Sequence, residues 1–121
     1  MKTILIIEDE PTLQKTLDLA LTQEGYEVKS ALDGEIGLKT AREVKPDLIL
    51  LDLILPKLDG FEVLEELKKD DGTKGIPVIV LTNLESAPDI ERALALGAFS
   101  YLVKANYDLK DVMTKIKEAI K

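Results

Sequence analysis

The sequence predicts an α/β fold in which a doubly wound, parallel β-sheet of five strands carries helices on both faces. Short apolar runs alternate strictly with amphipathic stretches along the chain. The runs at the third and fourth strand positions are apolar on both faces, so each must be covered twice. The connections are short, which favours parallel strands joined by right-handed crossovers.

The five predicted strands are short runs rich in apolar or β-branched residues. They are Ile4–Ile7, Tyr26–Ser30, Leu48–Leu51, Val78–Leu81 and Tyr101–Val103. Pro46 and Pro77 stand just before the third and fourth runs, which agrees with a strand beginning after each proline.

The five predicted helices lie after the strands, and each carries residues of one face at helical spacing. In chain order these residues are Leu13, Leu17 and Leu21; Ile36, Thr40 and Ala41; Val63, Leu64 and Leu67; Ile90 and Leu94; and Leu109, Val112, Met113, Ile116 and Ile120. Pro11 suits the first turn of the first helix and Gly25 its end. The segment Ser86–Asp89 resembles a capping box with a proline inside the helix start.

The bulk composition restricts the classes of function. A chain of 121 residues fits one domain over residues 1–121, and its 45% hydrophobic but only 4% aromatic content indicates an aliphatic core. The net charge of -7 disfavours direct binding of nucleic acid or of a membrane surface. The apolar start ends at Glu8, too soon for a signal peptide or a membrane span, so we expect a cytoplasmic protein.

The chain contains neither histidine nor cysteine. A bound metal must therefore have oxygen ligands, and a phosphohistidine can only come from another protein.

Ligands of open parallel sheets bind outside the carboxyl ends of the strands. The polar residues at those positions are Glu8, Asp9, Glu10, Asp52, Thr82, Asn83 and Lys104. Asp52 lies inside the apolar run Leu48–Leu55, where a carboxylate costs several kcal/mol unless a cation or hydrogen-bond donors compensate it.

If the third strand lies beside the first, Asp52 meets Glu8 and Asp9 at neighbouring strand ends. Carboxylates this close repel one another, and a divalent cation relieves the repulsion. An all-oxygen set of carboxylates, a backbone carbonyl and water suits Mg²⁺.

Each of these residues also has a purely structural interpretation. Asp9 or Glu10 can cap the first helix, Asp52 can be an aspartate of a surface turn, and Thr82 is an ordinary strand residue. Lys104 can extend from an edge strand into water. Taken together, however, the set supplies what a phosphorylatable carboxylate needs: a nucleophile, a metal, a hydroxyl donor and a cation.

The chain resembles, from end to end, a receiver domain of two-component response regulators, close to the single-domain chemotaxis and sporulation-relay kind. The matching residues are Glu8 and Asp9, Asp52 with Pro56 and Asp59-Gly60, Thr82, Gly97-Ala98, Tyr101 and Lys104. The resemblance implies the flavodoxin-like strand order 2-1-3-4-5.

By this resemblance Asp52 is the phosphoacceptor. Asp9 and Asp52 bind Mg²⁺ directly, together with the backbone carbonyl of Ile54, and Glu8 assists, often through water. Mn²⁺ is the expected substitute ion.

The resemblance also implies a switch. Thr82 and Lys104 contact the phosphoryl oxygens, and movement of Thr82 leaves space into which Tyr101 rotates. The surface of the fourth helix, fifth strand and fifth helix then changes and contacts a downstream effector protein or domain.

The resemblance implies that the phosphoryl donor is a sensor histidine kinase or a histidine phosphotransfer protein. The domain would be a monomer or a weak, phosphorylation-dependent dimer. It would catalyse only its own phosphoryl transfer and autodephosphorylation, and would not otherwise be an enzyme.

Four features depart from the family pattern. Glu8 replaces the commoner aspartate, and Asn83 stands where a small residue usually follows the threonine. Leu55 replaces a frequent methionine, and Ala105-Asn106 replaces the usual proline-aromatic pair after the lysine.

Three other classes of protein share some of these features. A phosphatase of the haloacid dehalogenase type needs a second acid two residues after the nucleophile, where this chain has Ile54. A flavodoxin-like electron carrier needs Ser, Thr and Gly in the first loop, which here is Glu8–Pro11. The alternative left open is a phosphate-independent pseudo-receiver that acts as an interaction module, although Asp9, Asp52, Thr82 and Lys104 are all present.

Overall fold

The computed structural model describes residues 1–120 of the chain. Five parallel strands form one sheet in the order β2-β1-β3-β4-β5, as predicted. The strands are β1 (Thr3–Ile7), β2 (Glu27–Ala31), β3 (Leu48–Leu51), β4 (Val78–Thr82) and β5 (Ser100–Val103). The helices are α1 (Pro11–Gln23), α2 (Gly34–Val44), α3 (Gly60–Lys69), α4 (Ala87–Ala95) and α5 (Leu109–Ala119), with a short 3₁₀ helix, η1 (Lys104–Asn106).

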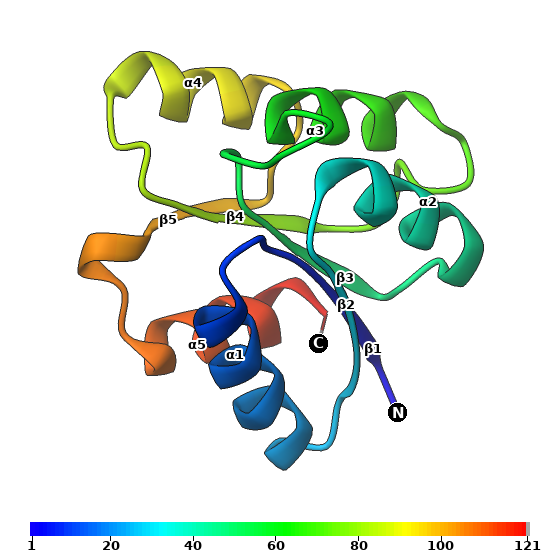
Figure 1. The fold of residues 1–121 in the computed structure, drawn as a ribbon, viewed down its shortest axis with the longest axis vertical. Helices are drawn as coiled ribbons and strands as arrows, with labels where there is room; N and C mark the ends of the chain where they lie inside the picture. Colours follow the sequence, from blue (N-terminus) through cyan, green and yellow to red (C-terminus); the bar gives the residue numbers. More distant parts are fainter. Residues whose placement is uncertain (121) are drawn as a thin grey trace.

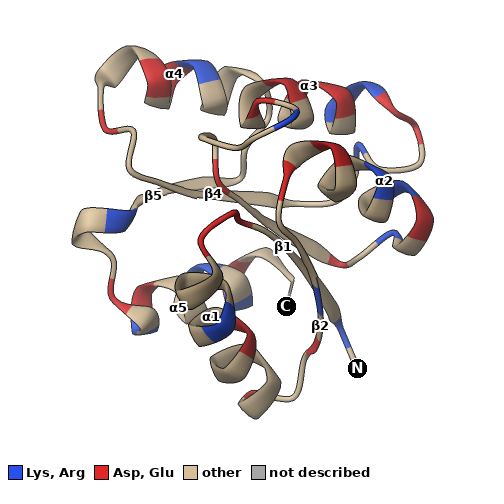
Figure 2. Cartoon of the chain, in the orientation of Figure 1, with Lys and Arg blue, Asp and Glu red and all other residues tan. Residues whose placement is uncertain are grey.

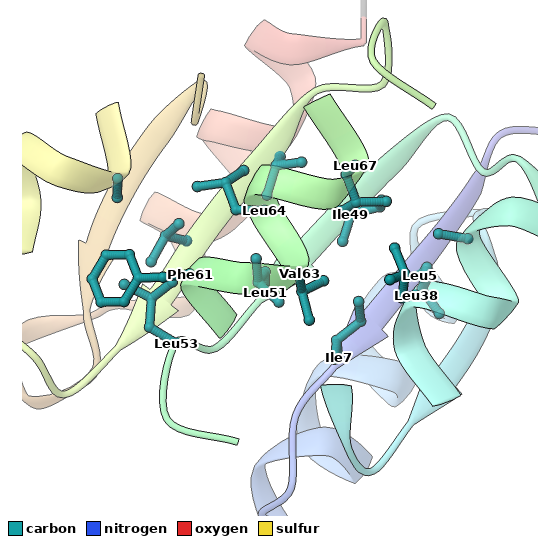
Figure 3. Close-up of a cluster of buried hydrophobic side chains, with 14 residues drawn as sticks. Leu5, Ile7, Leu38, Ile49, Leu51, Leu53, Phe61, Val63, Leu64 and Leu67 are labelled. Atoms are coloured by element: carbon teal, nitrogen blue, oxygen red, sulfur yellow. The ribbon is translucent and has the colours of Figure 1, made fainter. Parts of the chain in front are cut away.

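The helices form two layers, with α2, α3 and α4 on one face of the sheet and α1 and α5 on the other (Figure 1). Successive side chains along each strand point to opposite faces of the sheet. One alternate set packs against α2, α3 and α4, and the other set packs against α1 and α5. Figure 3 shows the first of these cores, where Ile49 and Leu51 of β3 lie near Leu67 and Val63 of α3. In the same view Leu5 of β1 lies near Leu38 of α2. The two-faced apolar strands are thus covered twice, as the sequence indicated.

The predicted strand boundaries are within one residue of those observed: β1, β4 and β5 are each one residue longer than predicted, and β2 is shifted by one residue. The prediction was Tyr26–Ser30, whereas the strand runs from Glu27 to Ala31. Tyr26 belongs instead to the turn after α1, since its backbone N–H donates to the Leu21 carbonyl at 3.1 Å. Pairing with β1 begins at Thr3 and Glu27.

The predicted helix starts are present. Pro11 occupies the first turn of α1, and the Ser86 side chain accepts a hydrogen bond from the Asp89 backbone at the start of α4. Gly25 follows α1 with a φ of 94°, a left-handed conformation that favours glycine.

The loop between β3 and α3 packs tightly on the sheet. A Cβ at Gly60 would collide with the backbone of Asp52 and Leu53, and one at Gly34 would collide with the Leu58 carbonyl. Both positions therefore require glycine, which lets the loop close over the end of β3 beside the amino end of α2.

The register brings the carboxyl ends of the central strands to one level. Ile7 of β1 pairs with Leu51 of β3, so Glu8 and Asp52 leave neighbouring strands side by side. The backbone N–H of Asp52 continues the ladder by donating to the Ile7 carbonyl at 3.0 Å. Within residues 1–120, none of the helices is both long enough and apolar enough to span a membrane.

Candidate functional site

Three carboxylates gather at the carboxyl edge of the sheet. Glu8, Asp9 and Asp52 each offer an oxygen, and these oxygens all lie within 4.8 Å of one another. Glu8 and Asp52 are only 3% and 4% exposed, whereas Asp9 is exposed to solvent. The structure thus brings together the acids that the sequence placed after β1 and β3. Figure 2, in which Asp and Glu are red, shows the acidic loop between β1 and α1.

Lys104 lies between two of these acids. Its Nζ is 2.7 Å from Glu8 Oε1 and 2.7 Å from Asp52 Oδ2, and its side chain is 10% exposed. Glu10 Oε2 lies farther away, at 3.8 Å. One ammonium group therefore faces three carboxylates, and Asp9 adds a fourth acid to the cluster, which leaves an excess of negative charge at the site.

The buried environment of the site shifts the pKa values of Glu8 and Lys104. Burial raises the pKa of Glu8 above its ordinary value, against the opposing effect of the hydrogen bond from Lys104. Burial by itself would lower the pKa of Lys104, but the hydrogen bonds and charges of Asp52 and Glu8 outweigh it and raise that pKa. The lysine therefore stays charged at neutral pH.

Asp52 opens onto a cleft of about 440 Å³. Its Oδ1 accepts a hydrogen bond from the Ile54 backbone at 3.2 Å, and its Oδ2 accepts the one from Lys104. Residues of four loops line the cleft: Asp9, Glu10, Pro11, Asp52, Ile54, Asn83 and Lys104. A phosphoryl group or an ion can reach the Asp52 carboxylate through this opening.

Thr82 is fully buried at the end of β4. Leu51 pairs with Val80, so Thr82 lies one residue beyond the level of Asp52 on the neighbouring strand. Its hydroxyl oxygen accepts a long hydrogen bond of 3.5 Å from the Leu84 backbone.

Tyr101 of β5 reaches the same loop, because its hydroxyl donates to the Leu84 carbonyl at 2.7 Å. Burial, and to a smaller extent the charges of Asp89 and Asp52, raise the pKa of Tyr101. The side chain is partly buried and is tied to the loop between β4 and α4. Thr82 and Tyr101 therefore both contact the backbone of Leu84.

The structure places three of the four departures from the family pattern around the cleft and the nearby core. The peptide bond after Lys104 is trans, and Ala105 and Asn106 continue from the lysine into η1. Asn83 is exposed and lines the cleft. Leu55 is partly buried and packs against the core under α3.

The donor set fits a hard divalent cation. All the available ligand atoms are oxygens from carboxylates and backbone, which suits Mg²⁺ or Mn²⁺. Among residues 1–120 no side chain donates a hydrogen bond to the exposed Asp9 carboxylate, so its oxygens face the cleft with their lone pairs available.

Two contacts of the site were not predicted. The carboxamide of Gln14 bonds to the carbonyls of Glu8 and Ala31, and the Leu84 carbonyl accepts from Tyr101. Gln14 is the fourth residue of α1, where a side chain points back toward the preceding strand, and this position was the available signal. Nothing in the sequence marks a backbone carbonyl such as that of Leu84.

A doubly wound sheet with clustered acids, a threonine and a lysine at its carboxyl edge is typical of signalling domains that use aspartyl phosphate. The profile of the response regulator receiver domain family matches residues 4–117. The chain belongs to this family of two-component systems, whose members are signalling domains rather than classical enzymes and are generally switched by phosphorylation.

The relatives include the DNA-binding dual master transcriptional regulator RpaA of Synechocystis, which is 38% identical over 121 residues. The alignment covers 100% of this chain and 50% of that protein. The chain thus spans about half the length of the curated relatives it matches.

Solved receiver structures are also similar. A CheY-like receiver domain protein from Methanospirillum hungatei has a TM-score of 0.92 and 32% identity, with 99% of this chain and 94% of that chain covered. The receiver domain of the sensor histidine kinase PA1611 from Pseudomonas aeruginosa, with magnesium in its active site cleft, has a TM-score of 0.89 at 29% identity over 98% of this chain and 97% of that chain. The Mn²⁺-bound response regulator Rcp1 has a TM-score of 0.81 at 34% identity, with 98% of this chain and 91% of that chain covered.

Proposed function

We propose that this domain is a Mg²⁺-dependent phosphoacceptor switch, and that Asp52 receives the phosphoryl group from a phosphohistidine of a partner kinase or phosphotransfer protein. The observation that supports this most strongly is the arrangement of Asp52 itself. It is a buried carboxylate that opens onto a cleft, lies within 4.8 Å of Glu8 and Asp9, and is paired with Lys104.

The phosphoryl transfer forms one bond to phosphorus and breaks another. A carboxylate oxygen of Asp52 attacks the phosphorus of the donor, forming a P–O bond as the P–N bond breaks. The electron pair of the broken bond stays on the imidazole of the donor, which takes up a proton from solvent. This chain has no histidine, so the donor is another protein.

Asp9, Asp52 and the Ile54 carbonyl are the residues we assign to the cation, with Glu8 assisting through water. A bound divalent cation would neutralise carboxylate charge and the charge that develops on the transferred oxygens. Lys104 would exchange its contact with Asp52 for one with a phosphoryl oxygen, and the Thr82 hydroxyl would donate to another.

The output would follow from the contacts of Leu84. Movement of Thr82 toward the phosphoryl group would shift the backbone that Tyr101 holds by its hydrogen bond to Leu84. The α4-β5-α5 surface would then favour a second conformation that a downstream effector recognises, with a weak dimer as the alternative use of the same surface.

The test is phosphorylation with a small donor. Acetyl phosphate with Mg²⁺ should add one phosphoryl group to the wild-type protein, detected by intact mass, and none to Asp52→Asn. The matched control is Asp71→Asn, since the Asp71 side chain is 92% exposed. Asp71 lies in the turn after α3 and is not among the residues that line the cleft. Labelling that survives Asp52→Asn would assign the acceptor to another residue.

The pseudo-receiver alternative makes the opposite prediction. A phosphate-independent interaction module would show no saturable response to Mg²⁺ and no mass change with acetyl phosphate. Titrating Mg²⁺ into the wild-type protein while recording amide chemical shifts separates the two functions.

A further inference from the structure

Gln14 connects the ends of two strands at the base of the acid cluster. Its side-chain Nε2 donates to the Ala31 carbonyl at 3.1 Å and to the Glu8 carbonyl at 3.3 Å. The Ala31 carbonyl also accepts the backbone N–H of Glu8 at 3.0 Å. These three bonds join the end of β1, the end of β2 and the first turns of α1.

The position of Gln14 on α1 explains its reach. The backbone N–H of Gln14 donates to the Glu10 carbonyl at 3.0 Å, so Gln14 closes the first turn of the helix. Side chains on a helix tilt toward its amino end, and here that end meets the strands. The side chain is partly buried, and both N–H groups of its amide have carbonyl partners.

The Glu8 carbonyl belongs to the peptide group that joins Glu8 to Asp9. A donor on this carbonyl fixes the orientation of that peptide plane, and so fixes the directions in which both acidic side chains leave the backbone. The Glu8 side chain is held further by the Glu10 N–H at 2.9 Å and by Lys104. In the part of the chain that the structure describes, the Asp9 side chain receives no such contact, so its direction depends more on the peptide.

We propose, on the basis of the function proposed above, that Gln14 is a positioning residue for the cation site. Its neutral amide holds the Glu8–Asp9 peptide, and thereby the Asp9 carboxylate, in the orientation that an octahedral Mg²⁺ requires. Groups that orient metal ligands change metal affinity by roughly tenfold to a hundredfold when they are removed.

Two ions distinguish positioning from general stabilisation. Mg²⁺ requires nearly ideal octahedral geometry with short bonds, whereas Ca²⁺ accepts longer and more variable ones. Loss of Gln14 should therefore weaken Mg²⁺ binding more than Ca²⁺ binding, and the ratio of the two affinities should fall. A residue that only stabilised the fold would leave this ratio unchanged.

The experiment uses Gln14→Met, which keeps the length of the side chain without its donors, and Gln14→Asn, which keeps the amide but shortens its reach. Gln23→Met is the matched control, since Gln23 is an exposed glutamine at the far end of the same helix. Dissociation constants for MgCl₂ and CaCl₂ come from amide chemical shifts, and circular dichroism confirms that each variant is folded.

We expect the Mg²⁺ dissociation constant to rise about tenfold in both Gln14 variants, with a smaller rise for Ca²⁺ and no change in Gln23→Met. Wild-type affinity in folded Gln14 variants, or an equal loss for both ions, would overturn the inference while leaving the proposed function intact. A wild-type protein without a saturable Mg²⁺ response would overturn both.

Discussion

Lys104 compensates two buried carboxylates that have few other partners. Its Nζ lies 2.7 Å from both Glu8 and Asp52, and the three side chains are at most 10% exposed. Removing one member of a buried charged group costs far more than breaking a surface pair, because the remaining charges stay buried. The lysine therefore has a structural role in addition to its proposed contact with the phosphoryl group.

We predict that Lys104→Met lowers the free energy of unfolding by about 3 kcal/mol in Mg²⁺-free buffer, and that Mg²⁺ restores part of the loss. Urea unfolding with and without Mg²⁺ measures both effects. The control is Lys69→Met, because Lys69 and Glu65 form an exposed pair on α3 that water screens, so its loss should change stability little. Equal losses for the two variants would argue against the compensating role.

Asn83 lies in the cleft that leads to Asp52, the proposed phosphoacceptor. It is exposed, it lines the cleft, and it stands where a smaller residue usually follows the threonine. We predict that Asn83→Ala increases the initial rate of modification by acetyl phosphate several-fold, since the shorter side chain opens the approach to Asp52. Intact mass at early time points measures the rate, and an unchanged or lower rate would contradict the prediction.

At the scale of the elements, Lys68 helps to hold the connection from α3 to β4. Lys68 of α3 donates to the carbonyls of Lys74 and Ile76 at 3.2 and 2.9 Å. Its aliphatic chain lies beside Gly97 in the turn before β5, where a Cβ would press against it. Burial lowers the pKa of Lys68.

This lowered pKa gives a pH dependence with a defined sign. The folded protein releases the Lys68 proton more readily than the unfolded chain, so the contribution of Lys68 to stability rises between its folded pKa and the ordinary value of 10.5. We predict that Lys68→Met costs about 1 to 2 kcal/mol at pH 7 through the lost hydrogen bonds, and more at pH 10. Urea unfolding at both pH values tests this; a smaller cost at pH 10 would contradict it.

Elements buried on both faces were predictable from the sequence, and exposed ones less so. β3 and β4 are buried at every position, and their continuous apolar runs gave the correct boundaries to within one residue. β2 is an edge strand with mostly exposed side chains, so its residues carry little hydrophobic pattern and its predicted start was one residue early.

For the site, convergence of Asp9 and Asp52 was predictable because strand order and strand ends determine it. The hydrogen bonds of Gln14 were not predicted, because a position near a helix start indicates which way the side chain points but not whether it is solvated or bonded to a strand end. The conformation of η1 after Lys104 was equally open, since the family pattern has a proline where this chain has Ala105.

At the scale of the whole molecule, binding of the proposed cation at the acidic edge of the sheet would be linked to folding. A ligand that binds only the folded state stabilises it, by about 2.7 kcal/mol at a concentration one hundred times its dissociation constant. We predict a Mg²⁺-dependent increase of this kind for the wild-type protein, measured by thermal or urea unfolding.

Asp9→Asn should remove most of this Mg²⁺-dependent increase. The same variant should be at least as stable as the wild type without Mg²⁺, because one of the repelling carboxylates is gone. Asp18→Asn, on the outer part of α1, is the control and should keep the full Mg²⁺ effect. An undiminished effect in Asp9→Asn would remove Asp9 from the proposed ligand set.

The most direct test of the central claim, that acids from separate strand ends share a divalent cation, is a crystal structure of the protein grown with Mn²⁺ and measured at a wavelength where manganese scatters anomalously. We predict an anomalous peak in the cleft, in contact with the carboxylates of Asp9 and Asp52 and with the Ile54 carbonyl. Carboxylates turned away from each other, with no manganese between them, would contradict it.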